Sequence, residues 1–241
     1  MTQVCLKHPC SMTATKSQIN RWNQQFADLT AQQRVELMAN EVTGQMAMTS
    51  SFGIHAAVTL HLINQVIPGI PVIMVDTGYL FAETYQFAEQ LQQQLRLNLQ
   101  VVQSPHSAAR FEAIHGQLWT QGLTGIEQYN QLRKVQPLKQ ALQQSEVDVW
   151  FSGVRRDQSE HRQSLPWVQL KNQRLKVHPL LDWSERDMYL YLQRHQLPQH
   201  PLWDQGYLTV GDTHTTRSIH EVDSEDQLRF MGLKRECGIH E

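Results

Sequence analysis

The sequence lacks any apolar run long enough to cross a bilayer. Its longest stretches, such as Ile70–Val75, are far shorter than the about 20 residues that a spanning helix needs. It also lacks a basic start followed by a hydrophobic segment, which is the pattern of a secretory signal. We therefore expect a cytoplasmic protein that has no membrane partner.

Positive charge is scarce as well. The 241 residues include 21 lysines and arginines against 23 aspartates and glutamates, which gives a formal net charge of -2. Without a broad positive field, nucleic acid is not an expected partner. A small anion can still bind where a few basic residues gather.

Internal repeats and low-complexity linkers are also absent, and the hydrophobic fraction of 40% is enough to fill a core. We expect a single folding unit. It would comprise an N-terminal extension over residues 1–20, one α/β domain over residues 21–225 and a C-terminal tail over residues 226–241.

Cysteine is rare, and the three present, Cys5, Cys10 and Cys237, are an odd number in a chain without a secretion signal. A disulfide framework is therefore not expected. Cys5 and Cys10 lie in a polar N-terminal stretch, where no catalytic role is expected for them.

Cys237 differs because Lys234 and Arg235 precede it and His240 follows it. Neighbouring positive charge lowers the pKa of a thiol and raises its thiolate fraction, although Glu236 acts in the opposite direction. Cys237 is thus a candidate nucleophile. A metal site with nearby histidines and an unreactive terminal cysteine remain as alternatives.

Short apolar runs alternate with amphipathic stretches along the chain, which is typical of a mostly parallel α/β sheet with helices on both faces. Strands are predicted at 46–49, 72–75, 99–102 and 147–151, and helices over 54–66, over 81–97 and from a capping box at Ser184 to before Pro198. Ligands of such sheets bind beyond the carboxyl ends of the strands, so the turns there are candidate sites.

Two of these turns carry hydroxyl or carboxylate groups. The first holds Ser50, Ser51, Phe52 and Gly53, and the second holds Asp76, Thr77 and Gly78. A strand-to-helix turn with free N–H groups and hydroxyls suits a phosphate or sulfate. The second turn could bind a nucleoside. In both turns an ordinary helix N-cap is the alternative interpretation.

The third turn holds Arg155, Arg156, Gln158 and Ser159, with Arg162 close behind. Guanidinium groups bind phosphate and sulfate oxygens in a bidentate manner. Asp157 and Glu160 could instead neutralise this cluster as a solvated ion-pair face. Further candidate cations are Arg133, Lys134, Arg229, Lys234 and Arg235.

From about residue 20 to its end, the chain resembles the thioredoxin-dependent phosphoadenosine phosphosulfate reductases of assimilatory sulfate reduction. Six ordered motifs carry the resemblance: Ser50-Ser51-Phe52-Gly53-Ile54, Asp76-Thr77-Gly78-Tyr79, Arg133-Lys134-Val135-Gln136-Pro137-Leu138, Gly153-Val154-Arg155-Arg156-Asp157-Gln158-Ser159, Gly211-Asp212-Thr213-His214-Thr215-Thr216 and Glu236-Cys237-Gly238-Ile239-His240.

The resemblance implies a Rossmann-like fold of the adenine-nucleotide α-hydrolase (PP-loop) type and a homodimer. It implies that Ser50 to Gly53 line the phosphosulfate end of the substrate and Asp76 to Gly78 its adenosine end. Arg155, Arg156 and Lys134 would bind its anionic groups. The residues that bind the 3′-phosphate are not assigned: the arginine cluster and the basic residues near the tail are both candidates.

In the chemistry that the resemblance implies, the Cys237 thiolate attacks the sulfonate sulfur and becomes an S-sulfonate, expelling adenosine 3′,5′-bisphosphate. No second cysteine lies nearby in the tail. Thioredoxin or glutaredoxin is therefore the expected partner that releases sulfite by thiol exchange.

Sister enzymes that use adenosine phosphosulfate hold an iron–sulfur cluster with a Cys-Cys pair and a later Cys-x-x-Cys. Those places hold Tyr129-Asn130 and Asp212 to Thr215 in this chain. Three cysteines cannot supply the four thiolates of a cluster, so no cofactor is expected and the 3′-phosphorylated nucleotide is the expected substrate.

Two other functions remain as alternatives. A PP-loop ATP pyrophosphatase, such as a sulfate adenylyltransferase subunit or a tRNA thiolase, usually has Ser-Gly-Gly-x-Asp-Ser in the first turn, whereas this chain has Ser50-Ser51-Phe52-Gly53-Ile54-His55. A nucleotide sensor or metal-binding protein is suggested only by the twelve histidines.

Overall fold

A computed structural model describes residues 14–234 and 238 of the chain. Six strands form one sheet in the order β3-β2-β1-β4-β6-β5, and all neighbours are parallel except the antiparallel pair β5 and β6. The strands are β1 Gln45–Thr49, β2 Pro71–Asp76, β3 Asn98–Gln103, β4 Val147–Ser152, β5 Val168–Lys171 and β6 Arg174–Val177.

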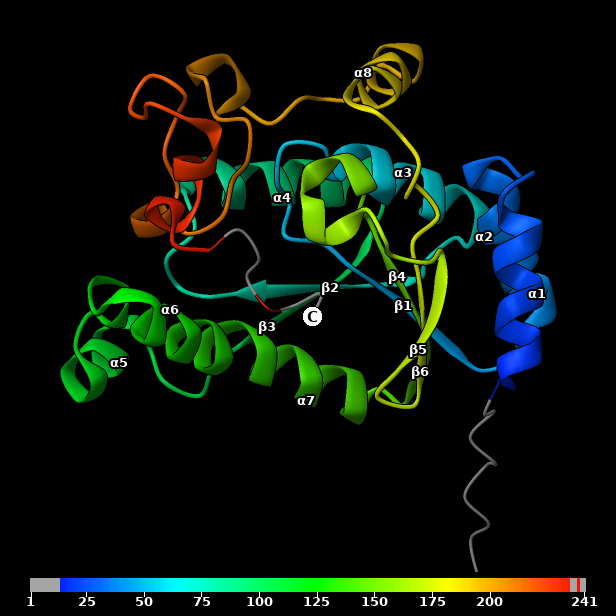
Figure 1. Ribbon diagram of the computed structural model, residues 1–241, viewed down its shortest axis with the longest axis horizontal. Coiled ribbons are helices and arrows are strands. Elements are labelled where there is room, and N and C mark those ends of the chain that lie inside the picture. The colour runs from blue at the N-terminus through cyan, green and yellow to red at the C-terminus, as the bar shows by residue number, and fades with distance from the viewer. Residues whose placement is uncertain (1–13, 235–237, 239–241) are drawn as a thin grey trace, which may run out of the picture.

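Helices cover both faces of this sheet (Figure 1). They are α1 Lys16–Phe26, α2 Ala31–Glu41, α3 Ala56–Val66, α4 Ala82–Leu95, α5 Ala108–His115, α6 Gly122–Asn130, α7 Gln136–Gln144 and α8 Glu185–Arg194. On one face, residues of α1 to α4 and α8 form a large core with alternate strand residues such as Met48 and Phe151. On the other face, α7 packs on Ala47, Ile73 and Trp150. The predicted α/β class is therefore confirmed.

All four predicted strands are present, each longer than predicted by one or two residues. Three of them, β1, β2 and β4, are apolar runs because central parallel strands are buried on both faces, whereas β3 is an edge strand and largely exposed. The predicted capping box is also present, since the Ser184 hydroxyl accepts from the N–H of Asp187 and the Asp187 carboxylate accepts from the N–H of Ser184. Helix α4 ends earlier than predicted because Arg96 adopts a left-handed conformation with φ of 52°.

Several elements were not predicted. The β5–β6 hairpin turns through Asn172 and Gln173, which both have positive φ. Helix α1 begins at Lys16, so the expected boundary after residue 20 falls inside a helix whose Trp22 and Phe26 are buried in the core. Residues 1–13 lie outside the described part of the chain.

Between α6 and α7 the chain makes a π-helical turn over Gln131–Val135. Such turns are rare and are frequent at functional sites. This one brings Arg133 and Lys134 into the interior, where 2% and 5% of their surfaces are exposed. Among residues 14–234, no helix is long and apolar enough to span a membrane.

Candidate active site

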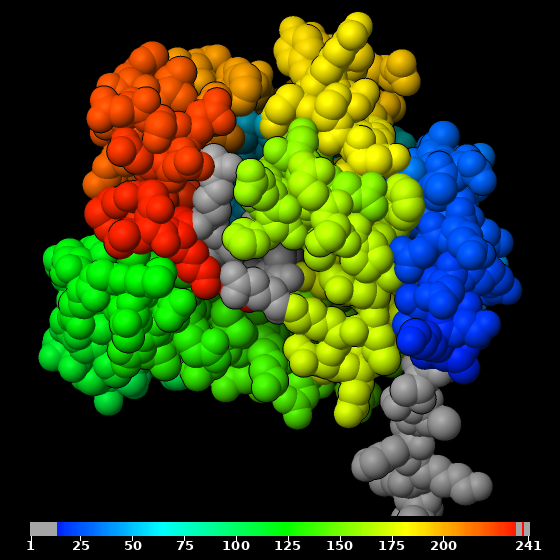
Figure 2. Space-filling model, viewed as in Figure 1, coloured from blue at the N-terminus to red at the C-terminus, as the bar shows by residue number. Residues whose placement is uncertain are grey.

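The three predicted turns are neighbours in space because they follow β1, β2 and β4, with β1 in the middle. Adjacent strands lie about 4.8 Å apart, so the outer two turns flank the first one closely. Residues from about 200 to 234 lie against the block formed by α5 and α6 (Figure 2), and this late segment packs on the same edge of the sheet.

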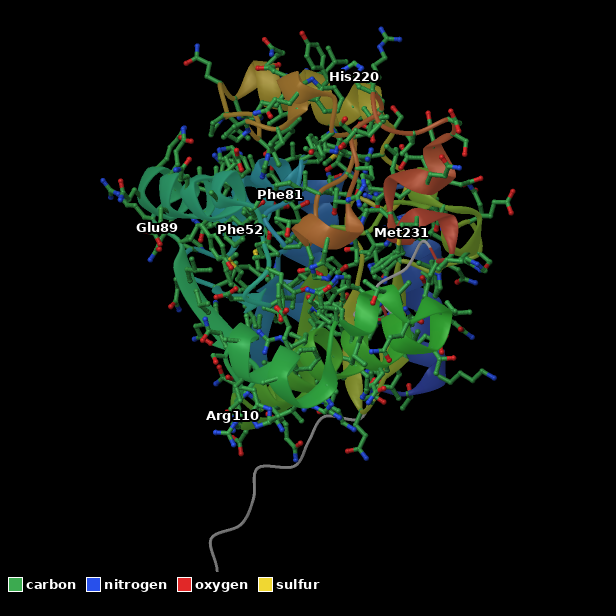
Figure 3. The ribbon with its side chains drawn as sticks, turned by 90° about the vertical axis from the view of Figure 1, so that its left-hand side faces the viewer. Phe52, Phe81, Glu89, Arg110, His220 and Met231 are labelled. Atoms are coloured by element: carbon green, nitrogen blue, oxygen red, sulfur yellow. The ribbon has the colours of Figure 1, made fainter. Side chains whose placement is uncertain are left out.

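The first turn is held by two hydrogen bonds of Ser50. The N–H of Ser50 donates to the carbonyl of Ile73 at 3.1 Å, and the Ser50 hydroxyl accepts from the N–H of Phe52 at 3.0 Å. Phe52 has φ of 49° and a fully buried ring, which Figure 3 shows within the body of the protein. Ser51 is exposed. A left-handed conformation is costly for a bulky residue and persists where the surroundings hold it.

Neither serine nor Asp76 caps a helix, so the N-cap interpretation is wrong for both turns. The N-cap residues are His55 for α3 and Phe81 for α4, and neither contributes a capping side chain. The Ser51 hydroxyl therefore caps no helix, although the carbonyl of Gly53 accepts at 3.0 Å from the N–H of Ala56, the first residue of α3.

Asp76 shapes the second turn. Its buried carboxylate accepts hydrogen bonds from the N–H of Gly78 at 2.7 Å, from the Tyr85 hydroxyl at 2.6 Å and from the Gln103 amide at 2.5 Å. Burial first, and then the hydrogen bond to Asp76, raise the pKa of Tyr85. These bonds assign Asp76 a part in fixing the turn.

Arg133, which lies in the π-helical segment, binds the backbone of the same turn. Its guanidinium donates to the carbonyl of Thr77 through two nitrogens, one of them at 2.9 Å, and to the carbonyl of His106 at 2.5 Å. Gly78 has φ of +76°, and a Cβ placed there would lie 2.9 Å from a guanidinium nitrogen of Arg133. Glycine is thus needed at residue 78 both for its conformation and for this close approach.

We expect Gly78→Ala to weaken nucleotide binding and to lower the free energy of unfolding by about 1–2 kcal/mol, the cost of a left-handed residue. Gly69→Ala is the matched control, because Gly69 has the same φ of +76° and nothing lies within 4 Å of its added Cβ. Urea unfolding should show a loss of stability in both variants, and a larger one in Gly78→Ala, whose added Cβ also displaces Arg133. Only Gly78→Ala should raise KM, and equal KM values in the two variants would contradict the importance of the Arg133 contact.

Lys134 faces Asp212, a residue of the late segment. The ammonium lies 2.6 Å from one oxygen of Asp212, whose other oxygen accepts from the Thr77 hydroxyl at 2.5 Å. Burial alone would raise the pKa of Asp212, but the charge and hydrogen bond of Lys134 hold it below its usual range. The carboxylate is therefore charged at neutral pH.

Aromatic rings lie beside this ion pair, since the Lys134 ammonium is 5.3 Å from the ring centroid of Tyr129. The ring of His214 stacks on Trp119 at a centroid distance of 3.8 Å and meets Tyr79 and Tyr129 edge to face. Burial lowers the pKa of His214 to about 4, so the imidazole is neutral at neutral pH. Burial and the nearby charge of Asp212 raise the pKa of Tyr129.

The third turn centres on Arg155, which is 1% exposed. Its guanidinium lies 2.5 Å from Glu185 and 3.2 Å from Asp157, and Glu185 also lies 2.9 Å from His55. Partial burial raises the pKa of Glu185, but His55 and Arg155 together bring it down to about 2. Arg155 is buried in this network, whereas the Glu185 side chain is 61% exposed, so one side of the network faces solvent while it joins the third turn to the start of α3.

The other predicted residues of the third turn have separate contacts. Arg156 stacks over Trp167 at 4.6 Å and donates to the carbonyl of Leu165 at 3.0 Å. The amide oxygen of Gln158 accepts from the N–H of Arg155 at 3.0 Å, and Ser159 is buried.

Arg229 lies in the late segment, where its guanidinium donates to the Thr209 hydroxyl at 3.3 Å and packs flat against Gly211. Its backbone pairs with Thr216, and Lys234 is half-buried. Five further residues with sequence-based expectations lie outside the described residues: Cys5, Cys10, Arg235, Cys237 and His240.

Residues 45–218 match the family model described as the phosphoadenosine phosphosulfate reductase domain. The chain belongs to the phosphoadenosine phosphosulfate reductase family. This matched range contains all three strand-end turns, the π-helical segment and Asp212, whereas Arg229 lies beyond it.

Two relatives and one solved structure extend the match. The chain is 48% identical to the phosphoadenosine 5′-phosphosulfate reductase of Alkalilimnicola ehrlichii over 97% of this chain and 95% of the relative. It is 52% identical to that of Klebsiella pneumoniae over 91% and 90%. It resembles the phosphate complex of the phosphoadenylyl-sulfate reductase from Candida auris with a TM-score of 0.75 and 25% identity, over 86% of this chain and all of that one.

The sequence did not single out Asp212, Glu185 or His55 as site residues, although each lies on a charged contact at this edge of the sheet. Glu185 lies in the first turn of α8. The sequence signal for Asp212 was its place in one of the family motifs, next to the glycine against which Arg229 packs.

Proposed function

We propose that this member of the phosphoadenosine phosphosulfate reductase family reduces 3′-phosphoadenylyl sulfate to sulfite and adenosine 3′,5′-bisphosphate, as a cytoplasmic homodimer of assimilatory sulfate reduction. The observation that carries the proposal is the juxtaposition of the three motif-bearing turns at the carboxyl ends of β1, β2 and β4. In open parallel sheets, that edge is where nucleotides bind.

The first step is displacement at sulfur. The thiolate of Cys237 forms a bond to the sulfonate sulfur, and the bond between that sulfur and the bridging phosphate oxygen breaks with its electron pair. The products are a cysteine S-sulfonate and adenosine 3′,5′-bisphosphate. Backbone N–H groups of the first turn and nearby cations would stabilise the charge that develops on the leaving phosphate.

The second step requires two electrons from a dithiol protein, thioredoxin or glutaredoxin. One thiolate of the donor attacks the Cys237 sulfur and expels sulfite, which leaves a mixed disulfide. The second donor thiol then resolves this disulfide, so that the donor leaves oxidised and Cys237 returns to its thiolate form. The support for an outside donor is the lack of a second cysteine near Cys237 in the sequence.

We further propose that the reaction needs no iron–sulfur cluster. The four positions that would carry cysteines hold Tyr129, Asn130, Asp212 and Thr215. Two of them contact Lys134, because Asp212 is its ion-pair partner and the Tyr129 ring centroid lies 5.3 Å from its ammonium. This side-chain set offers no thiolate and does not fit a cluster.

The deciding experiment incubates the pure protein with 3′-phosphoadenylyl sulfate, with adenylyl sulfate or with neither, and measures the intact mass. We expect the mass of one added SO3 group with the 3′-phosphorylated nucleotide, located on Cys237 by peptide mapping and removed by reduced thioredoxin. An unmodified Cys237, or faster modification by adenylyl sulfate, would refute the proposed substrate and intermediate.

A further inference from the structure

Asp212 is a fully buried carboxylate that joins two separate parts of the candidate site. None of its surface is exposed, and its two oxygens contact the Lys134 ammonium at 2.6 Å and the Thr77 hydroxyl at 2.5 Å. A buried carboxylate is costly unless its charge is paired and hydrogen-bonded. The position of Asp212 is therefore fixed by both partners at once.

On one side, Asp212 secures the nucleotide-binding turn. Besides the bond from Thr77, Asp212 forms a β-bridge with Leu80, and the N–H of Thr213 donates to the carbonyl of Tyr79 at 2.9 Å. These contacts attach the turn after β2 to the late segment of the chain. A displacement of Asp212 would thus move the turn expected to hold the adenosine end of the substrate.

On the other side, Asp212 secures the segment that leads to Cys237. The Lys134 ammonium that it holds lies 5.3 Å from the ring centroid of Phe230, which is fully buried. Phe230, Met231 and Gly232 have consecutive positive φ values of 51°, 56° and 80°. Such a run is unfavourable without support from surrounding contacts. The ring of Phe230 against Lys134 supplies one such contact, seven positions before Cys237.

We propose that Asp212 is a positioning residue for the attack of Cys237 on the sulfonate. Through Thr77 it sets the nucleotide-binding turn, and through Lys134 and Phe230 it sets the start of the C-terminal segment. In this role it keeps the two reacting groups aligned. The inference rests on the proposed function.

The variant Asp212→Asn tests the proposal, because it keeps the shape of the side chain and removes its charge. The test compares the effect on alignment of the reacting groups with the effect on nucleotide binding. Rapid-quench mass spectrometry measures the rate of S-sulfonation of Cys237 at saturating nucleotide, and calorimetry measures Kd for adenosine 3′,5′-bisphosphate. We expect the rate to fall about tenfold or more, because small misplacements of reacting groups are costly. We expect Kd to rise by a smaller factor.

Asp182→Asn is the matched control. Asp182 also pairs with a buried cation, Arg34, at 2.5 and 2.8 Å, but it has no contact with Thr77, Lys134 or Phe230 among the described interactions. This variant should lose stability and yet sulfonate at the wild-type rate. Loss of rate in Asp212→Asn no greater than in Asp182→Asn would overturn the proposal.

Phe230→Leu provides a second measurement that does not disturb the ion pair and stays available if Asp212→Asn does not fold. It should slow S-sulfonation and leave Kd unchanged, because the Phe230 ring contacts Lys134 and Arg229 and has no described contact with the turn that holds Thr77. Sulfonation at the wild-type rate in this variant would also overturn the proposal. Failure of the proposed function is distinguishable, since the wild-type protein itself would then form no S-sulfonate.

Discussion

A Cys237→Ser variant should bind the nucleotide as tightly as the wild type and yet form no measurable sulfite. The substitution replaces sulfur by oxygen with little change of shape, so the expected nucleotide contacts of the strand-end turns persist. Serine has no low-pKa thiolate and cannot form the S-sulfonate. Because removal of a covalent nucleophile eliminates the pathway, sulfite release should fall by roughly a thousandfold or more.

Two measurements on the same preparation check this result. Calorimetry with adenosine 3′,5′-bisphosphate reports binding, and a coupled assay with reduced thioredoxin reports sulfite release. Cys5→Ser and Cys10→Ser are the matched controls, since they remove a thiol from the N-terminal stretch for which no catalytic role is expected. Retained turnover in Cys237→Ser, or a comparable loss in either control, would show that the nucleophile is misassigned.

The sheet could be predicted from the sequence because its central strands are apolar runs. β1, β2 and β4 are buried on both faces, and each is followed by a polar or glycine-containing turn that marks its carboxyl end. The order of the strands was not predicted and comes from the structure, which places β1 between β2 and β4. The adjacency of the three turns follows from that order.

The β5–β6 hairpin could not be predicted from the sequence pattern. Its strands are four residues each, with Lys171 and Arg174 flanking the turn, so they carry little apolar signal. The two turn residues, Asn172 and Gln173, both have positive φ, for which a glycine would have been the usual sign. The hairpin is instead held by packing, with Val168, Leu175 and Val177 buried in the core.

The contacts that build the site were not predictable from local pattern either. Thr77 and Asp212 are 135 positions apart, and neither the π-helical turn nor the burial of Lys134 has a sequence signature of its own. Lys134 was expected to face an anion of the substrate, and its ammonium is held by an anion of the protein. Such pairings depend on tertiary packing. A sequence motif indicates where a site lies but does not predict which of its side chains pair with one another.

A Lys134→Met variant should lose about 3–5 kcal/mol of unfolding free energy, because it leaves the carboxylate of Asp212 buried without its cation. The sign of the pH dependence should also change. In the wild type, the ion pair holds the pKa of Asp212 below its usual range, so this contribution is lost as pH falls. In the variant, burial without the cation raises that pKa, so the deficit in stability should shrink as pH falls.

The double variant Lys134→Met/Asp212→Leu separates the two roles of the ion pair. Replacing both charges with apolar side chains of similar size is often neutral for stability, so urea unfolding should recover most of the loss of the single variant. S-sulfonation should stay slow, because a hydrophobic pair accepts no bond from Thr77 and offers no cation to Phe230. Recovery of both stability and rate would show that the pair serves only to fill the interior, and a single-variant loss below about 1 kcal/mol would show that the ion pair is solvated.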